Sequence, residues 1–188
     1  MSGSGTPLTA AEEGIWLGQR IDPTSPAFNT AERIDIEGDL DMARWAAAVR
    51  AVFDSAATLH RRFVADPATG APVAVGAPRH DWVIEHVDGR GQADPQAWAV
   101  AWTAAAAGRP LRPDAGELFR VALLRTGEHT WVWYHQVHHL AVDGYATMQL
   151  IGRVAEHYRT GTFNAAGFDT TALDALAAAD ATYQASPE

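Results

Sequence analysis

The sequence contains no cysteine among its 188 residues. That absence excludes disulfide bonds, a thiol nucleophile and cysteine-ligated zinc, and it fits a cytoplasmic protein. Basic residues are few: 14 lysine and arginine residues stand against 23 aspartate and glutamate residues, which gives a net charge of −9 at pH 7. Because nucleic acids and anionic membranes attract clustered basic side chains, neither is expected as a main partner.

Long apolar runs are also missing. No stretch approaches the roughly 18 consecutive apolar residues that cross a bilayer, so no membrane span is expected. The opening residues, MSGSGT, lack the apolar segment of a signal peptide, and we expect residues 1–7 to form a flexible leader. A hydrophobic content of 47% is ample for one buried core in a soluble globular protein.

The hydrophobic periodicity predicts helices and strands in a mixed order. Residues 8–19 are expected to form a helix with Thr9 at its N-cap and Glu12 three residues later, the arrangement called a capping box. A second helix is capped near Asp41 and carries an apolar stripe from Trp45 to Leu59. Alternating and apolar runs predict strands at 30–36, 60–64, 73–75, 81–87, 118–124 and 128–139, and further helices at 94–105, 145–159 and 171–184. This order predicts an α/β sandwich.

The stretch from Thr130, TWVWYHQVHHLAVDGY, organises the chain. Its aromatic and β-branched start is typical of a buried strand, and the pair Asp143-Gly144 turns a chain sharply. After this pair the apolar residues recur at helical spacing, so the turn leads into a helix. His138 and His139 therefore stand at the end of a strand, just before the N-terminus of a helix.

This layout has chemical consequences. Neighbouring side chains on a strand point to opposite faces, so one of His138 and His139 is expected to face the core and the other a cleft. An imidazole in a cleft can accept a proton at neutral pH. Gly144 lies where backbone N–H groups lack intrahelical partners, and it is either a donor to an oxyanion or a simple turn glycine. Asp143 is expected to cap the helix rather than orient an imidazole as in a triad.

The spacing HHLAVDG at residues 138–144 resembles the His-His-x-x-x-Asp-Gly motif of condensation domains in nonribosomal peptide synthetases. Chloramphenicol acetyltransferase-like enzymes and plant acyl-CoA acyltransferases share the shorter His-x-x-x-Asp-Gly core, so the residues indicate acyl transfer more firmly than peptide-bond formation. The resemblance implies that His139 is the catalytic histidine and that Asp143 pairs with an arginine. His138 is then assigned a structural role, with its ring hydrogen-bonded in the core.

The resemblance also implies a fold and a domain plan. The expected fold is a chloramphenicol acetyltransferase-like two-layer sandwich with a mixed sheet and flanking helices, of which this chain holds the N-terminal lobe, residues 8–160. Residues 161–188 are expected to form a linker and an alanine-rich helix that lead to the absent second lobe.

Two other motifs of the family match less closely. The first usually has serine and glutamine where this chain has Thr9 and Glu12. The second, Arg-His-Glu-x-Leu-Arg-Thr, begins at residues 55–57, which read Ser-Ala-Ala here, and its second arginine is replaced by His60. If the strand begins at His60, Arg62 lies on the same face, which makes Arg62 the candidate arginine partner.

By resemblance, the parent domain joins an acyl or peptidyl thioester on one carrier protein to the amine of an aminoacyl thioester on another. The substrates are carried on 4′-phosphopantetheine of these partner carrier proteins, and the chain itself is expected to bind no cofactor. No metal site is expected either, because strand alternation separates His138 from His139 and no zinc-binding helix pattern occurs.

Several alternatives remain open. With a single lobe the isolated chain is expected to be an incomplete, inactive fragment, and a non-catalytic module that binds carrier or partner proteins is one alternative. Dimerisation through the open face of the lobe is another way to cover the site. The last two alternatives are an acyl-CoA-dependent acyltransferase and an epimerisation domain, because the same motif resembles the motifs of both.

Overall fold

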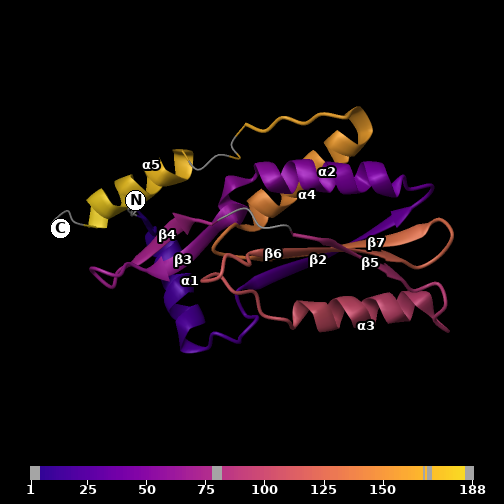
Figure 1. Ribbon diagram of the computed structural model, residues 1–188, viewed down its shortest axis with the longest axis horizontal. Helices are drawn as coiled ribbons and strands as arrows, with labels where there is room; N and C mark the ends of the chain where they lie inside the picture. Colours follow the sequence, from indigo (N-terminus) through magenta and orange to yellow (C-terminus); the bar gives the residue numbers. More distant parts are fainter. Residues whose placement is uncertain (1–4, 78–81, 167, 169–170, 185–188) are drawn as a thin grey trace.

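A computed structural model describes residues 5–77, 82–166, 168 and 171–184. Its main sheet has four strands in the spatial order β2 (Asn29–Glu37), β7 (Thr130–His138), β6 (Phe119–Arg125) and β5 (Ile84–Asp88). Figure 1 labels these strands between the helices. β5 runs parallel to β6, and the other neighbours are antiparallel. This mixed sheet with flanking helices confirms the predicted α/β fold.

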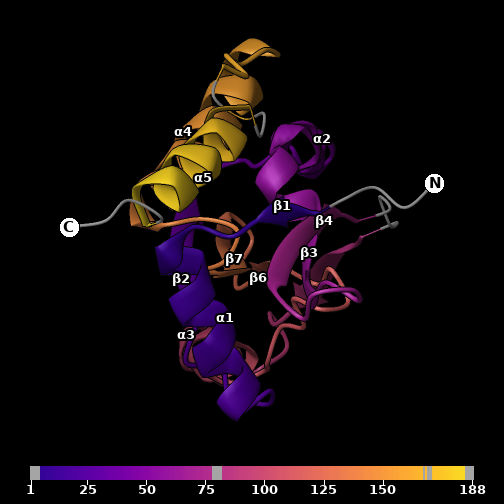
Figure 2. The same cartoon turned by 90° about the vertical axis from the view of Figure 1, so that its left-hand side faces the viewer.

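A smaller antiparallel sheet lies at one end of the molecule (Figure 2). Its order is β1 (Thr6–Pro7), β4 (Pro72–Gly76) and β3 (Arg61–Ala65), so the predicted hairpin is confirmed. The structure corrects the end of the predicted leader, because Thr6 and Pro7 pair with β4. Residues 1–4 lie outside the described part of the chain.

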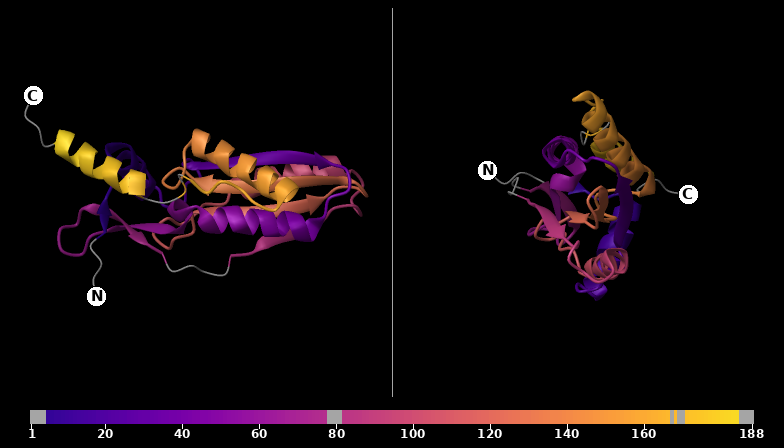
Figure 3. Two further views of the ribbon diagram at one scale, coloured as in Figure 1. Left: turned by 90° about the horizontal axis from the view of Figure 1, so that it is seen from above. Right: turned by 90° about the vertical axis from the view of Figure 1, so that its right-hand side faces the viewer.

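Helices cover both faces of the main sheet (Figure 3). α2 (Met42–Ser55) and α4 (Gly144–Thr160) pack together on one face, above a core that includes Phe53 and Trp133. α3 (Pro95–Ala107) covers the opposite face, where Ala99 packs near Val132 and Tyr134. β7 is therefore buried on both sides, which explains its almost unbroken run of large apolar residues.

Two more helices lie at the end occupied by the small sheet (Figure 1). They are α1 (Ala10–Ile21) and α5 (Thr171–Gln184), and α5 has the bounds expected from the sequence. The carboxylate of Asp180 in α5 accepts a hydrogen bond from the Ala10 N–H at 2.8 Å. The last helix is thus held against the first turn of the first one.

The predicted helix caps are confirmed. Thr9 and Glu12 form the expected capping box at α1, and Asp41 and Asp143 accept backbone N–H groups at the starts of α2 and α4. Asp94 caps α3 in the same way. Each cap joins residues two to three positions apart, which is why the sequence reveals it. Within the described ranges, no helix has the length and apolar content to cross a bilayer.

Some boundaries differ from the prediction. α2 ends at Ser55, and Leu59 belongs to a separate 3₁₀ turn, η1 (Ala57–His60), although its side chain is still buried in the same core. β5 begins at Ile84, and the predicted start at residue 81 lies outside the described residues. The Trp82 indole donates to Asp54 Oδ1 of α2 at 2.7 Å. β7 stops at His138, one residue before the predicted end.

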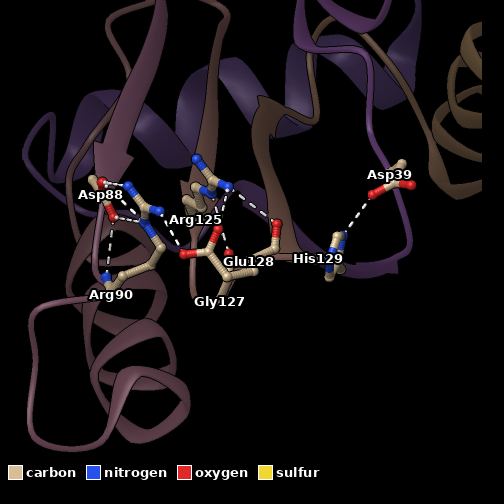
Figure 4. A network of polar contacts seen from close by, with 7 residues as sticks. All are labelled: Asp39, Asp88, Arg90, Arg125, Gly127, Glu128 and His129. Carbon is tan, nitrogen blue, oxygen red and sulfur yellow. Dashed lines mark hydrogen bonds and ion pairs between the residues drawn. The ribbon is translucent and has the colours of Figure 1, made fainter.

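An exposed network of charges ties the loops together at the other end of the main sheet (Figure 4). Arg90 binds Asp88 at 2.7 Å and Glu128 at 2.9 Å, and Arg125 also contacts Glu128. Hydrogen bonding to Arg90 lowers the pKa of Asp88 to about 2. Because these side chains are solvated, we expect the network to order the loops more than to stabilise the fold.

Candidate active site

His138 is anchored inside the protein. It is the last residue of β7, it is fully buried, and its backbone N–H donates to the Leu118 carbonyl. Its ring Nδ1 accepts a hydrogen bond from the Leu140 N–H at 3.1 Å, and its Nε2 lies 3.0 Å from Gln19 Oε1. Burial lowers the pKa of His138 to about 4, with a smaller contribution from His139. A neutral ring with both nitrogens occupied supports the structural role expected for His138.

His139 lies in the turn between β7 and α4. Its backbone N–H donates to the Phe28 carbonyl at 2.9 Å, and the residue is partly exposed. It lines a pocket of about 680 Å³. The two histidines therefore separate as expected, one into the core and one to a pocket, but His139 has already left the strand, so the turn and not strand alternation sets its direction.

The pocket is walled by the first turn of α1, the turn before α4, and α5. Three carboxylates line it, Glu12, Asp143 and Asp180. Each of them already accepts a hydrogen bond from a backbone N–H at a helix start. The imidazole of His139 is then the side chain in this pocket whose chemistry suits proton transfer near pH 7.

Asp143 and Gly144 begin α4 beside His139. Asp143 Oδ1 accepts from the Ala146 N–H at 2.8 Å, which is the expected cap. Gly144 occupies the first helical position, where the backbone N–H has no acceptor within the helix. Its φ is not positive, so the turn does not demand glycine, and a Cβ there would meet no atom within 4 Å. The structure around residue 144 therefore gives no steric or backbone reason for glycine.

Two adjacent arginines, Arg61 and Arg62, have different positions relative to the pocket. Because His60 lies in η1 and not in β3, the argument that it shares a face with Arg62 fails. Arg62 is exposed, and among the described residues no ion pair joins it to Asp143. Its neighbour Arg61 is buried and lies 3.5 Å from Glu12, which lines the pocket.

His135 has a purely internal position. It is 1% exposed, its ring packs on Trp133 and Phe53, and neither ring nitrogen has a hydrogen-bond partner in the described part of the chain. Burial lowers its pKa to about 4. His135 therefore does not reach the pocket, and within the described residues no group of three histidine, aspartate or glutamate side chains suits a metal ion.

Three residues of the site carried no signal in the sequence. Gln19 contacts His138 across 119 positions, Asp180 reaches the pocket from α5, and Arg61 pairs with Glu12. All three contacts join separate elements of secondary structure, so the periodicity of a helix or a strand does not predict them. The capping box shows that Glu12 is held at a helix start, but only the fold shows what Glu12 faces.

Comparisons with known proteins agree on one family. The family model of the condensation domain matches residues 4–165. The isonitrile lipopeptide synthase of Streptomyces coeruleorubidus is 41% identical over 152 residues, 81% of this chain and 10% of the relative. Enterobactin synthase component F of Escherichia coli (strain K12) is 31% identical over 155 residues, 82% of this chain and 12% of the relative.

Solved structures give the same answer. The crystal structure of the starter condensation domain of rhizomide synthetase RzmA superposes with a TM-score of 0.83 at 36% identity, covering 98% of this chain and 45% of that one. The first condensation domain of the CDA synthetase gives a TM-score of 0.84 at 27% identity, with 98% and 48% coverage. The chain thus spans just under half of these solved domains. With the histidine motif at the pocket and the family model over most of its length, the chain belongs to the condensation domain family of nonribosomal peptide synthetases.

Proposed function

We propose that this chain is the histidine-bearing lobe of a domain that forms amide bonds in nonribosomal peptide synthesis. The observation that carries the proposal is the different placement of the two motif histidines. Both ring nitrogens of His138 make internal hydrogen bonds, whereas His139 lines a pocket at a helix N-terminus. Such a site offers a proton acceptor next to backbone donors, which is what aminolysis of a thioester needs.

The reaction follows from these positions. The acceptor amine attacks the thioester carbonyl carbon, and His139 takes the proton that the amine loses. The Gly144 N–H donates to the oxyanion of the tetrahedral intermediate. Collapse of the intermediate breaks the C–S bond, the thiol leaves with the proton returned by His139, and the amide remains. Proton transfer of this kind contributes roughly 10²–10⁴-fold to the rate.

Carrier proteins are the proposed partners. Both substrates are then tethered through 4′-phosphopantetheine, which brings two thioesters to one pocket and converts a bimolecular step into a nearly unimolecular one. The relatives support this assignment, since they are peptide and lipopeptide synthases. We place the protein in the cytoplasm, in keeping with its cysteine-free sequence.

A soluble acyl-CoA is the second candidate donor. A variant of the RzmA starter condensation domain has been crystallised with C8-CoA and Leu-SNAC. It superposes with a TM-score of 0.81 at 35% identity, covering 97% of this chain and 42% of that one. That complex supports an acyl-CoA donor as well as a carrier-bound one. Acceptance of an acyl-CoA without any carrier protein distinguishes the two.

We propose that the other lobe of the condensation domain forms the second wall of the pocket. The pocket of His139 lies at the surface of a lobe that spans 45% of the solved RzmA domain, so we expect the lobe alone to be inactive. A non-catalytic module that binds carrier proteins, or a dimer joined through the open face, is the alternative. Turnover by the 188-residue chain, together with its mass in solution, separates these outcomes.

The test compares the 188-residue chain, the same chain continued into the rest of a condensation domain, and that longer chain with His139→Ala. C8-CoA and Leu-SNAC are the soluble probes. Amide formation by the longer chain and a 10²–10⁴-fold lower kcat in the variant are expected. His86→Ala, at an exposed position on β5, is the matched control. A His139→Ala chain that works at the wild-type rate would falsify the proposal.

A further inference from the structure

Gln19 is the buried side chain through which α1 reaches the histidine motif. It is 7% exposed and lies in the last turns of α1. Its Nε2 donates to the carbonyl oxygens of Asp22 at 2.9 Å and Ser25 at 3.2 Å. Two carbonyl acceptors can only face the NH₂ end of the amide, so the Oε1 end must point toward His138.

This orientation determines the protonation of His138. The Leu140 N–H can only donate, so His138 Nδ1 must be the unprotonated acceptor. The ring is then the neutral tautomer with its proton on Nε2, and that proton points to Gln19 Oε1 at 3.0 Å. Every polar atom along the path from the Ser25 carbonyl to the Leu140 N–H has a partner of the right kind.

The same part of the chain also holds the backbone of His139. The His139 N–H donates to the Phe28 carbonyl at 2.9 Å, and Phe28 packs directly on Gly18, where an added Cβ would lie 2.6 Å from its ring. Gly18 and Gln19 therefore anchor the 22–28 loop together. The loop thus binds the backbone of His139 itself, and the His138 ring binds the backbone of the next residue, Leu140. The His139 residue between these two hydrogen bonds lines the pocket.

We propose that Gln19 is a positioning residue for His139, acting through the tautomer and orientation of His138 and through the 22–28 loop. The inference rests on the proposed function, since it assigns Gln19 a part in the reaction at His139. Gln19 does not line the pocket of His139 but a neighbouring one, so its part is to set the direction from which the imidazole is presented. Because misplacement by about 1 Å can cost roughly 100-fold in rate, an ordered anchor of this kind governs kcat more than substrate binding.

The first experiment needs no variant. Long-range ¹H–¹⁵N NMR of the wild-type 188-residue chain reports which ring nitrogen of each histidine carries the proton. For His138 we expect the Nε2–H tautomer at pH 7, with an N–H proton protected from exchange. A His138 protonated on Nδ1, or an Nε2–H in fast exchange, overturns the proposal even if every variant fails to fold.

The second experiment separates positioning from a general loss of structure. In the longer active chain, Gln19→Met keeps the side-chain volume and removes every hydrogen bond, so kcat should fall about 10–100-fold while KM changes by less than about twofold. Gln19→Glu keeps the acceptor for His138 but loses both donors, and an intermediate kcat is expected. Gln96→Met, which removes a glutamine bonded to Arg33 and Thr126 on the far side of the molecule, is the control and should leave kcat unchanged.

The outcomes distinguish this inference from the proposed function. A folded Gln19→Met chain with wild-type kcat, or one that changes only KM, contradicts the positioning role. If the wild-type domain turns over none of the probes, the proposed function fails and NMR alone decides. Positioning then requires that the His139 ring resonances shift in Gln19→Met and stay unchanged in Gln96→Met.

Discussion

Asp143 Oδ1 lies 2.8 Å from the Ala146 backbone nitrogen, so the carboxylate of the motif caps α4. A carboxylate that holds a helix start is separate from the triad arrangement in which an aspartate orients an imidazole. In the structure Asp143 therefore caps α4, while the part proposed in the reaction belongs to His139.

Replacement of Asp143 should act on stability first. Asp143→Ala removes the cap and is expected to lower the free energy of unfolding by about 1 kcal/mol, whereas Asp143→Asn retains an acceptor and should cost a few tenths. Urea denaturation measures both. Asp94→Ala, the equivalent cap of α3 on the other face of the sheet, is the control. Loss of activity in Asp143→Asn as large as in His139→Ala would show that the carboxylate orients the imidazole after all.

Gly144 permits stability and activity to be separated. Its φ is ordinary and a Cβ meets no neighbour, so Gly144→Ala should be neutral or stabilise the protein by up to about 1 kcal/mol. If Gly144 donates to the oxyanion as proposed, the added methyl group would obstruct the thioester, and kcat in the complete domain should fall at least tenfold. Gly152→Ala, in the middle of α4 with equally open space, should stabilise without changing kcat. Equal activity in both variants would remove Gly144 from the site.

The two adjacent arginines of β3 should behave differently. Arg61→Met breaks a buried contact with Glu12 and is expected to destabilise the fold by about 1–3 kcal/mol. Arg62→Met, on the exposed side of the same strand, should change stability by less than about 0.5 kcal/mol. Thermal unfolding of both variants is the measurement. A larger effect at Arg62 would favour the arginine partner expected from the sequence.

Acid should destabilise the protein through its buried histidines. Desolvation lowers the pKa values of His135 and His138 to about 4 in the folded state, below the ordinary 6.5, so the unfolded chain binds more protons between these values. Stability should therefore be constant above about pH 6.5 and decline as the pH falls toward 4, by at most about 3 kcal/mol for each ring. Chemical denaturation across this range measures the slope, and a flat profile would contradict the burial.

His135 offers a matched test of that slope. Its ring nitrogens have no partner among the described residues, so His135→Leu should leave stability at pH 7 unchanged or raise it by about 1–2 kcal/mol. The same variant should remove about half of the acid dependence, because one of the two imidazoles is gone. A destabilised His135→Leu chain would indicate that the ring is hydrogen-bonded in solution.

Relationships between residues close together in the chain follow from the sequence. The capping box of Thr9 and Glu12, the cap at Asp143 and the buried strand before His138 each depend on residues within a few positions of one another. Backbone hydrogen bonds at a helix start and the two faces of a strand follow directly from such spacings. For that reason the sequence by itself determined the order of elements, the turn that carries His139 and the family resemblance.

Only the tertiary structure decided which side chains surround that turn. Gln19 contacts His138 across 119 positions, Asp180 lines one side of the pocket, and Arg61 lies 3.5 Å from Glu12. These contacts depend on how separate elements pack, and packing is set by the whole buried surface rather than by any repeating pattern. The sequence therefore determined the turn that carries His139, and only the fold determined which side chains pack around that turn.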